Sequence, residues 1–510
     1  MTPMLAKGRG AALGAVLALV LVFGAASSHG QVLRVGLAED PDILDPTLAR
    51  TFVGRIVFSA LCDKLFDIDE QLKIVPQLAT AYEWSGDHKS LLIKLRRGVT
   101  FHDGEKLDAQ AVKFNLDRHF TLPGSSRRTE MGPITRVDVV DPDTVRIEMS
   151  SPFAPLLATL ADRAGMMVAP EAARAAGANF AANPICSGPF RFVSRVAQDR
   201  IVLDRYSGYW NKDAIHFDRV VYVPMVDSTV RLANLQSGQL DFIERAAASD
   251  IPAVESDRRF KISRIVDIGY YGITINVGKS ELAQKTPLGR DPRVREALDL
   301  SLDREALVQV VMEGEAEPGN QWVAPGNPYY AKNFPIPKRD VARARALLRQ
   351  AGTPNPAVTL LTPTTSDAQK LGQVVQAMAQ EAGFDIKLQS TEFTTSLAMA
   401  DKGQFEAYVV AWSGRADPDG NIQTRLTCKG PTNYSGYCDA EVDTLIDEAR
   451  TTLEPAERAR AYEQVAAKVL ADRPIIYLLH RKWLWAYSAR LSGVRLVPDG
   501  LLRVQDLKLN

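Results

Sequence analysis

The sequence predicts an α/β fold divided into more than one lobe. Short apolar strand runs alternate with amphipathic helical patterns along most of the chain, which is typical of α/β proteins. The chain has 510 residues, and a single hydrophobic core seldom grows beyond about 250–300 residues. The length therefore favours two or more cores. The sequence shows no internal repeat and no low-complexity tract.

The first part of the chain predicts strands, two helices and a hairpin. Asp108 is a good N-cap for a helix that continues to His119, because its carboxylate can accept hydrogen bonds from the first free amides. Asp141-Pro142-Asp143 is a typical turn between two alternating strand runs. The expected elements in this part are strands at 31–37 and 91–95, helices at 53–64 and 108–119, and a hairpin at 137–149.

The same alternation continues after Gly188-Pro189. Gly352 and Gly383 each follow a helical pattern and are expected to end it. The expected strands are 190–196, 200–205, 219–224, 240–243, 271–277, 358–361, 385–388 and a region that begins at 475–479. The expected helices are 228–237, two within 291–314, 341–352, 368–383, 441–451 and 455–473.

The N-terminus predicts export. Lys7 and Arg9 precede an uncharged apolar run at 11–25, and small residues follow at 26–28. This pattern is typical of a secretory signal peptide, and the run is too short for a membrane span. No Cys follows the run, so no lipobox is expected. We expect residues 1–30 to be cleaved and the mature protein to be soluble and exported.

The charge balance argues against nucleic-acid partners. The chain has 61 basic and 61 acidic residues, and loss of residues 1–30 removes only Lys7 and Arg9, which leaves 59 against 61. A nearly neutral chain offers no electrostatic surface for nucleic acid or anionic membrane.

The four cysteines fit an oxidising compartment. Cys428 and Cys438 lie ten residues apart across a segment rich in turn formers, and we expect them to form a local disulfide. Cys62 and Cys186 are expected either to pair or to be two buried thiols. Their spacing is not that of a zinc site, so no metal ligation is predicted.

The most informative stretch is the Trp412 loop, residues 412–421. It follows the apolar strand run 407–411, and turns are expected at Asp417-Pro418 and Asp419-Gly420. An aromatic ring, the guanidinium of Arg415 and two carboxylates therefore lie at a strand end, a usual place for ligand contacts. The alternative is a polar turn in which Trp412 fills the domain interface.

Six further stretches, in order, carry a family resemblance. The chain resembles the dipeptide/oligopeptide-binding group of ABC importer solute-binding proteins, family 5, over nearly all of residues 33–509. The matching stretches are Leu33-Arg34-Val35-Gly36-Leu37 with Leu44-Asp45-Pro46, Gly98-Val99-Thr100-Phe101-His102-Asp103-Gly104, Ser187-Gly188-Pro189-Phe190, Tyr209-Trp210 with Ser237-Gly238, Asp291-Pro292-Arg293-Val294-Arg295-Glu296-Ala297-Leu298, and the run from Ala342-Arg343 through Leu347-Leu348 to Ala351-Gly352.

The resemblance implies a two-lobed periplasmic binding protein of type II with an extra α/β domain, a ligand cleft between the lobes and a hinge made by several chain crossings. It places lobe I at 31–75, 184–275 and 490–510, the additional domain II at 76–183, and lobe II (domain III) at 276–489. It also implies a monomer without a cofactor. Such a protein closes on a peptide or related solute and delivers it to permease subunits in the inner membrane.

The resemblance makes position 415 informative. In peptide-binding relatives the third residue after the loop Trp is usually an Asp that pairs with the ligand's α-ammonium, whereas this chain has Arg415. A guanidinium prefers carboxylates, so the ligand is expected to be anionic or N-blocked there. The alternative is that Arg415 pairs with Asp417 or Asp419, leaving one carboxylate for an ammonium. The predicted ligand-binding residues are Trp412, Arg415, Asp417, Asp419, Tyr271 and Tyr434.

Two other functions remain as alternatives. An anionic metal chelate could bind to Arg415 in the same fold. A secreted hydrolase is a remote alternative, because the five His outside residues 1–30 are scattered and no Gly-x-Ser-x-Gly or Cys/His motif occurs. No catalytic residue is therefore predicted.

Overall fold

The computed structural model describes residues 31–510, which form one compact unit. The predicted signal peptide, residues 1–30, lies outside the described residues. The architecture is α/β, built on a twelve-stranded sheet and a separate four-stranded sheet. No helix within 31–510 has the length and apolar character that a membrane crossing requires.

The first half of the large sheet is built around β1. This strand pairs in parallel with β10 on one side and with β11 on the other. Its inward residues Leu33, Val35 and Leu37 are fully buried in a core that it shares with helix α1 (Phe52–Leu61). The strands of this first half-sheet are β1 (Val32–Leu37), β8 (Phe190–Val196), β9 (Arg200–Arg205), β10 (Arg219–Pro224), β11 (Phe242–Ile243) and β12 (Phe260–Val266).

The second half of the large sheet has its own core. Strand β13 pairs antiparallel with β17, which in turn pairs in parallel with β15. The apolar faces of α9, α10 and α12 pack against these strands. The strands of this second half-sheet are β13 (Tyr270–Ile275), β14 (Ala316–Pro318), β15 (Ala357–Pro363), β16 (Asp385–Thr391) and β17 (Ala407–Trp412).

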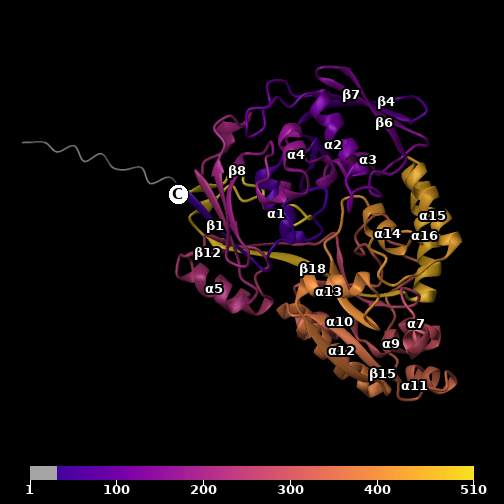
Figure 1. Ribbon diagram of the computed structural model, residues 1–510. Coiled ribbons are helices and arrows are strands. Elements are labelled where there is room, and N and C mark those ends of the chain that lie inside the picture. The colour runs from indigo at the N-terminus through magenta and orange to yellow at the C-terminus, as the bar shows by residue number, and fades with distance from the viewer. Residues whose placement is uncertain (1–30) are drawn as a thin grey trace, which may run out of the picture. The chain divides into compact units, whose positions relative to one another are not determined.

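One long strand, β18 (Ile475–Ser488), belongs to both half-sheets (Figure 1). Its first part, from Ile475 to Arg481, pairs with β13 and β14. Its second part, from Lys482 to Ser488, pairs with β12 and β11. The sequence predicted only the beginning of this strand. It is buried along nearly all of its length, so its side chains do not alternate between apolar and polar in the usual way.

A four-stranded antiparallel sheet carries a third core. Its order is β4-β5-β7-β6, with β4 (Ala79–Trp84), β5 (Ser90–Leu95), β6 (Ile134–Asp141) and β7 (Thr144–Met149). Helix α2 (Ala109–Thr121) packs on this sheet. Its predicted cap is confirmed, because the Asp108 side chain accepts hydrogen bonds from the amides of Gln110 and Ala111. Short paired strands complete the fold: β2 (Phe66–Ile68) with β3 (Ile74–Pro76), and β19 (Leu491–Ser492) with β20 (Lys508–Leu509).

Most predicted helices are confirmed within a few residues. Gly352 and Gly383, with φ of 71° and 109°, follow α11 and α12 in the left-handed conformation that favours glycine. The longer helices are α1 (Phe52–Leu61), α5 (Ser228–Gln236), α9 (Pro292–Ser301), α10 (Arg304–Met312), α11 (Val341–Gln350), α12 (Ser366–Ala382), α13 (Phe393–Asp401), α14 (Asp419–Leu426), α15 (Ala440–Thr451) and α16 (Pro455–Asp472). The shorter α-helices are α3 (Leu156–Leu160), α4 (Pro170–Ala176), α6 (Ile251–Glu255), α7 (Leu282–Lys285) and α8 (Pro287–Arg290).

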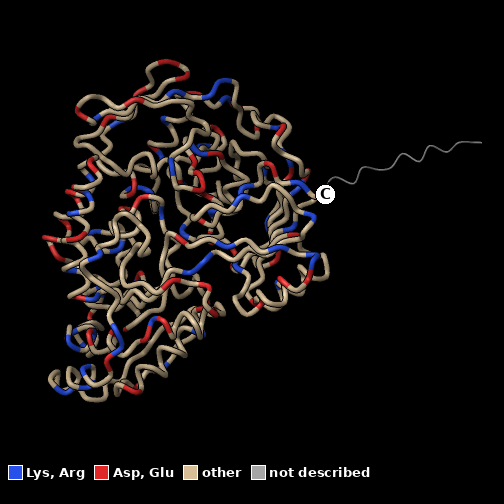
Figure 2. The backbone as a smooth tube through the Cα atoms, turned by 180° about the vertical axis from the view of Figure 1, so that it is seen from behind, with Lys and Arg blue, Asp and Glu red and all other residues tan. Residues whose placement is uncertain are grey.

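The turn predicted at Asp419-Gly420 is wrong, because α14 begins at Asp419. The predicted domain boundaries stay a prediction, because the structure divides residues 31–510 into no smaller units against which the boundaries could be compared. Strand β13, assigned by those boundaries to lobe I, pairs with strands of the second half-sheet. Basic and acidic residues are intermixed along the described chain (Figure 2).

Candidate functional site

A cavity of about 770 Å³, part of it open to solvent, lies where the two half-sheets meet. Its walls come from the segment before α1, from β13 and β17, from α13 and α14, and from the middle of β18. Concave sites that combine apolar walls with a few charged groups are typical of small-ligand sites. Its charged and aromatic lining residues are Glu39, Arg50, Phe52, Arg245, Tyr271, Phe393, Trp412, Arg425, Tyr434 and Arg481.

Arg425 is the unusual group in this cavity. It lies in α14, is only 4% exposed, and its guanidinium carbon lies 4.3 Å from the ring centroid of Trp412 and 5.3 Å from that of Tyr434. Its buried Nε atom has no hydrogen-bond partner within the part of the chain that the structure describes. No carboxylate of residues 31–510 forms an ion pair with it. A buried cation without a counter-ion is costly, so the arrangement indicates a place for an anion.

Two cavity arginines on the first half-sheet's side have acidic partners. Arg50, which precedes α1, bonds both oxygens of Asp401 at 2.7 and 3.1 Å and donates to the Tyr434 hydroxyl at 2.6 Å. Arg245 donates to Glu39 at 2.7 Å and to Glu244 at 2.8 Å. These pairs hold the two side chains in fixed orientations at the cavity wall.

Arg481 also has an acidic partner. It lies in β18, and its Nε donates to Asp267 at 3.1 Å. Its guanidinium carbon lies 4.1 Å from the Trp483 ring. Burial raises the pKa of Asp267 to about 6, and the attraction of Arg481 opposes this rise. Four arginines and the single carboxylate of Glu39 thus line the cavity, so its charge is predominantly positive.

Three predicted ligand residues, Tyr271, Trp412 and Tyr434, line this cavity. Tyr271 and Trp412 come from the paired strands β13 and β17, in which Tyr271 lies opposite Ala411 and Tyr270 opposite Trp412. Burial raises the pKa of Tyr271 to about 12, so its hydroxyl stays protonated at neutral pH. Contact of these side chains with a ligand stays a prediction.

The other three predicted residues line a second cavity, of about 440 Å³. Arg415 does not pair with Asp417 or Asp419. Its Nε lies 2.7 Å from Asp162, which follows α3 and also accepts a hydrogen bond from Arg55 at 3.0 Å. Burial lowers the pKa of Arg415 to about 9, and Asp162 opposes this. Although burial alone would raise the pKa of Asp162, Arg55 and Arg415 hold it well below its usual range.

Asp417 and Asp419 are occupied by two other arginines. Arg458 of α16 donates to both oxygens of Asp417, at 2.9 and 2.7 Å. Arg450 of α15 lies 3.1 Å from Asp419. Burial raises the pKa of Asp419 to about 6, and Arg450 opposes this. The predicted roles of Arg415, Asp417 and Asp419 in binding stay predictions, and in this structure each charge already has a partner.

Asn421 and Gly414 set the shape of the Trp412 loop. The Asn421 side-chain oxygen accepts from the Trp412 indole at 3.0 Å and from the Arg415 amide at 2.8 Å. Gly414 has a φ of 68°, and a Cβ at that position would lie 2.4 Å from the backbone of Ile268. The loop therefore packs against the segment before β13, and Trp412 lines the first cavity.

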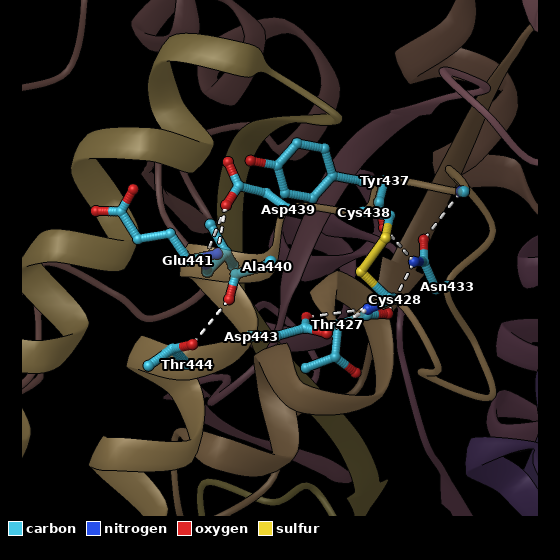
Figure 3. Close-up of a disulfide and its surroundings, with 12 residues drawn as sticks. Thr427, Cys428, Asn433, Tyr437, Cys438, Asp439, Ala440, Glu441, Asp443 and Thr444 are labelled. Atoms are coloured by element: carbon cyan, nitrogen blue, oxygen red, sulfur yellow. Dashed lines mark hydrogen bonds between the residues drawn. A yellow bond between two sulfur atoms is a disulfide. The ribbon is translucent and has the colours of Figure 1, made fainter.

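One of the two disulfides closes a segment that contributes to the wall of the first cavity. Cys428 and Cys438 form a disulfide, as predicted. Cys62 and Cys186 also form a disulfide, which is the first of the two alternatives expected for them. Figure 3 shows the Cys428–Cys438 bond with Asn433, which donates to the carbonyls of Thr427 and Tyr437 at 2.9 and 2.7 Å. The closed segment contains Tyr434, so these bonds fix a residue of the cavity wall.

Sequence reasoning missed Arg425, Arg50, Arg481 and Glu39. Arg425 had only a weak signal: it lies between Ile422 and Leu426, but most buried positions of α14 are polar. The other three carried no local signal, since they reach the cavity only through long-range pairing of strands and loops.

Two curated relatives of this chain carry the same name. The chain is 30% identical to the "Glutathione-binding protein GsiB" of Pectobacterium atrosepticum over 481 residues, which covers 91% of this chain and 92% of that protein. It is 29% identical to the protein of the same name from Salmonella paratyphi A, which covers 98% of both chains.

Solved structures share the two-lobed, type II fold, which confirms the predicted fold class. The agropinic acid complex of AgaA from A. tumefaciens R10 has a TM-score of 0.85 at 26% identity, covering 94% of this chain and 99% of that one. The dipeptide-binding protein from Pseudoalteromonas sp. SM9913, bound to Met-Leu, has a TM-score of 0.87 at 20% identity, covering 94% and 100%. The family model described as "Bacterial extracellular solute-binding proteins, family 5 Middle" matches residues 73–433. The chain therefore belongs to family 5 of the bacterial extracellular solute-binding proteins.

Proposed function

We propose that the protein is the receptor of an ABC importer and captures a small peptide or related solute through a carboxylate bound to Arg425. The observation that carries this proposal is the buried guanidinium of Arg425, which lines the cavity without a counter-ion. A bound carboxylate would accept two parallel hydrogen bonds from such a group and neutralise its charge.

The surroundings of Arg425 support an anionic ligand. The rings of Trp412 and Tyr434 both pack against the guanidinium and restrict its orientation. Arg50, Arg245 and Arg481 add positive charge to the cavity walls, although each has its own acidic partner. Preorganised side chains lose little entropy on binding, so most of the interaction free energy is available for affinity.

The relatives suggest which solutes to test first. Two similar proteins are named glutathione-binding, and a structural neighbour holds agropinic acid. We propose glutathione and other small carboxylate-bearing solutes as candidate ligands of this chain. The N-blocked class predicted from Arg415 belongs in the same comparison, as does an anionic metal chelate.

The remaining parts of the proposal follow from the family. We propose that residues 1–30 are removed during export, that the mature monomer works in the periplasm without a cofactor, and that permease subunits recognise its ligand-bound form. The protein acts as a receptor and not as an enzyme. Its binding free energy favours the conformation in which both half-sheets contact the solute.

The test compares the affinities of matched ligands for the wild type and for matched variants. Ligand-free protein is titrated by calorimetry with glutathione, with dipeptides bearing a free or amidated C-terminus, with N-acetylated dipeptides and with a nickel–histidine chelate. The structure predicts that the free carboxylate form binds and that its amide does not. Removing one partner of a buried charged pair costs about 2–5 kcal/mol, so Arg425→Gln should lose about 30-fold or more in affinity.

Two controls make the result specific. Arg425→Lys keeps the charge and loses the forked donor geometry, so its affinity should lie between those of the wild type and Arg425→Gln. Arg460→Gln removes a surface guanidinium whose side chain is 71% exposed and should bind like the wild type. Equal affinity of Arg425→Gln and the wild type for every carboxylate ligand would refute the proposal.

A further inference from the structure

We infer that Glu39 binds an ammonium group of the solute, in addition to the carboxylate that Arg425 binds, so that the preferred ligand is zwitterionic. This inference rests on the proposed function, because it concerns the same cavity and adds a second charged contact to it. It makes Glu39 a specificity-determining residue that selects solutes with a free amino group over N-blocked ones.

Glu39 is the only acidic residue among the described residues that line the first cavity. It lies in the segment between β1 and α1 and is 7% exposed. Asp417 and Asp419, the alternative ammonium sites predicted from the sequence, line the second cavity instead. Both already contact arginines, Arg458 and Arg450 respectively. Glu39 is therefore the carboxylate that the first cavity offers to a cationic group.

Only one oxygen of Glu39 is used within the described protein. Its Oε1 accepts a hydrogen bond from Nη1 of Arg245 at 2.7 Å, whereas its buried Oε2 has no hydrogen-bond partner within residues 31–510. Arg245 is shared with a second carboxylate, because its Nε donates to Glu244 at 2.8 Å. A carboxylate oxygen removed from water without a donor is unfavourable, so the arrangement leaves a place for a donor of the solute.

An ammonium group fits this position better than a neutral donor does. Arg245 provides one positive charge for the two carboxylates of Glu39 and Glu244, and no other basic group of the described residues forms an ion pair with either. A cation at Glu39 would offset the second negative charge. An ammonium group also carries three donors, and hydrogen bonds between charged groups are stronger than those between neutral groups.

Glu39 and Arg425 come from different halves of the large sheet. Glu39 follows β1 of the first half-sheet, whereas Arg425 lies in α14, which follows β17 of the second half-sheet. Burial raises the pKa of the Tyr408 hydroxyl in β17, and the charges of Arg425 and Glu39 act on this hydroxyl in opposite directions. Both charges thus lie within electrostatic reach of one side chain. A zwitterionic solute would contact both halves at once, which favours the conformation that holds it.

The experiment removes the ammonium group from the ligand and the charge from Glu39. Alanyl-leucine and propionyl-leucine, which differ only in the ammonium group, are titrated by calorimetry against the wild type, Glu39→Gln and Glu39→Asp. The wild type should bind propionyl-leucine about 30-fold or more less tightly, because one partner of a buried charged pair is missing. Glu39→Gln keeps the shape of the side chain without its charge, so it should lose this preference. Glu39→Asp keeps the charge on a shorter side chain and should show an intermediate preference.

Glu244→Gln is the matched control, because Glu244 contacts the same guanidinium and does not line the cavity. This variant should keep the wild-type preference for alanyl-leucine, whatever its melting temperature. A purely structural role of Glu39 would weaken the binding of both ligands equally, so an unchanged affinity ratio in Glu39→Gln would overturn the inference. Wild-type protein that binds the two ligands equally, or that binds neither, would overturn it without any variant.

The proposed function is tested separately by a third ligand. Alanyl-leucine amide keeps the ammonium group and lacks the carboxylate. Equal affinity of the wild type for the amide and for alanyl-leucine would refute the carboxylate contact of Arg425. It would leave the ratio of alanyl-leucine to propionyl-leucine affinity, which tests Glu39, unchanged.

Discussion

The two disulfides should contribute unequally to stability, and the difference follows from the lengths of chain that they close. Cys428–Cys438 spans a sequence separation of 10, whereas Cys62–Cys186 spans 124. Replacing each pair with two alanines removes one cross-link and leaves the other intact. Cys62 and Cys186 are 1% and 0% exposed, so their replacement also removes buried sulfur atoms from the first core.

The loop lengths give the expected magnitudes. A cross-link removes loop-closure entropy from the unfolded chain as the logarithm of loop length, which gives about 3 kcal/mol for the short loop and about 5 kcal/mol for the long one. The Cys62→Ala/Cys186→Ala variant should therefore be less stable than the Cys428→Ala/Cys438→Ala variant by about 2 kcal/mol. Lost packing of the two buried sulfurs adds to this difference.

The assay is guanidinium-induced unfolding of the wild type and both double variants in oxidising buffer, followed by tryptophan fluorescence. The reduced wild type is the matched control, because it has lost both cross-links without any substitution. It should be less stable than either variant in oxidising buffer. If the short-loop variant were as unstable as the long-loop variant, chain entropy would not explain the role of these bonds.

Two further predictions concern buried charges. Arg503 bonds Asp67 at 2.7 Å and Asp499 at 3.0 Å, and Asp67 has a second partner in Lys64 at 2.6 Å. Arg503→Met therefore leaves the buried Asp499 without its charged partner and should cost about 3–5 kcal/mol in urea unfolding. Arg495→Met, at a half-exposed pair, should cost less than about 1 kcal/mol. A smaller loss for Arg503 would contradict the ion-pair assignment. Burial lowers the pKa of His119 to about 3, against 6.5 for an exposed imidazole. The folded protein therefore holds the neutral form, and this contribution to stability is lost as the pH falls below 6.5. Between pH 6.5 and about pH 5 the wild type should lose about 2 kcal/mol relative to His119→Gln, which does not titrate, and parallel pH profiles in chemical denaturation would refute this.

The sequence predicted the elements whose side chains alternate or whose ends carry caps. Asp108, Gly352 and Gly383 mark helix ends through local backbone chemistry, so they could be identified without the fold. Helix α14 was missed because Asp-Pro-Asp-Gly contains turn-forming residues. Pro418 and Asp419 are equally favourable at the start of a helix, where proline fixes φ and a carboxylate meets the free amides.

The site was predicted only in part, because some of its residues contact partners that are far away in the sequence. Trp412, Tyr271 and Tyr434 reach the first cavity, because strand ends and the disulfide-closed segment are natural cavity walls. The partner of Arg415 could not be predicted, since Asp162 lies in a segment brought close only by tertiary packing. The sequence suggested a neighbouring carboxylate, and the structure supplies a distant one.

The position of β18 near the end of the chain has a consequence for the order of folding. Residues 475–488 supply a central strand to both half-sheets, and every other strand of these half-sheets comes earlier in the sequence. Neither half can complete its hydrogen bonds while the chain is still being synthesised. Nascent chains should thus remain unable to reach the native state until almost the last residues have been added. A protein that crosses a membrane before folding benefits from such a delay. Fusing a stable domain after residue 510 would preserve the delay, whereas a circular permutant that begins at β18 would abolish the delay.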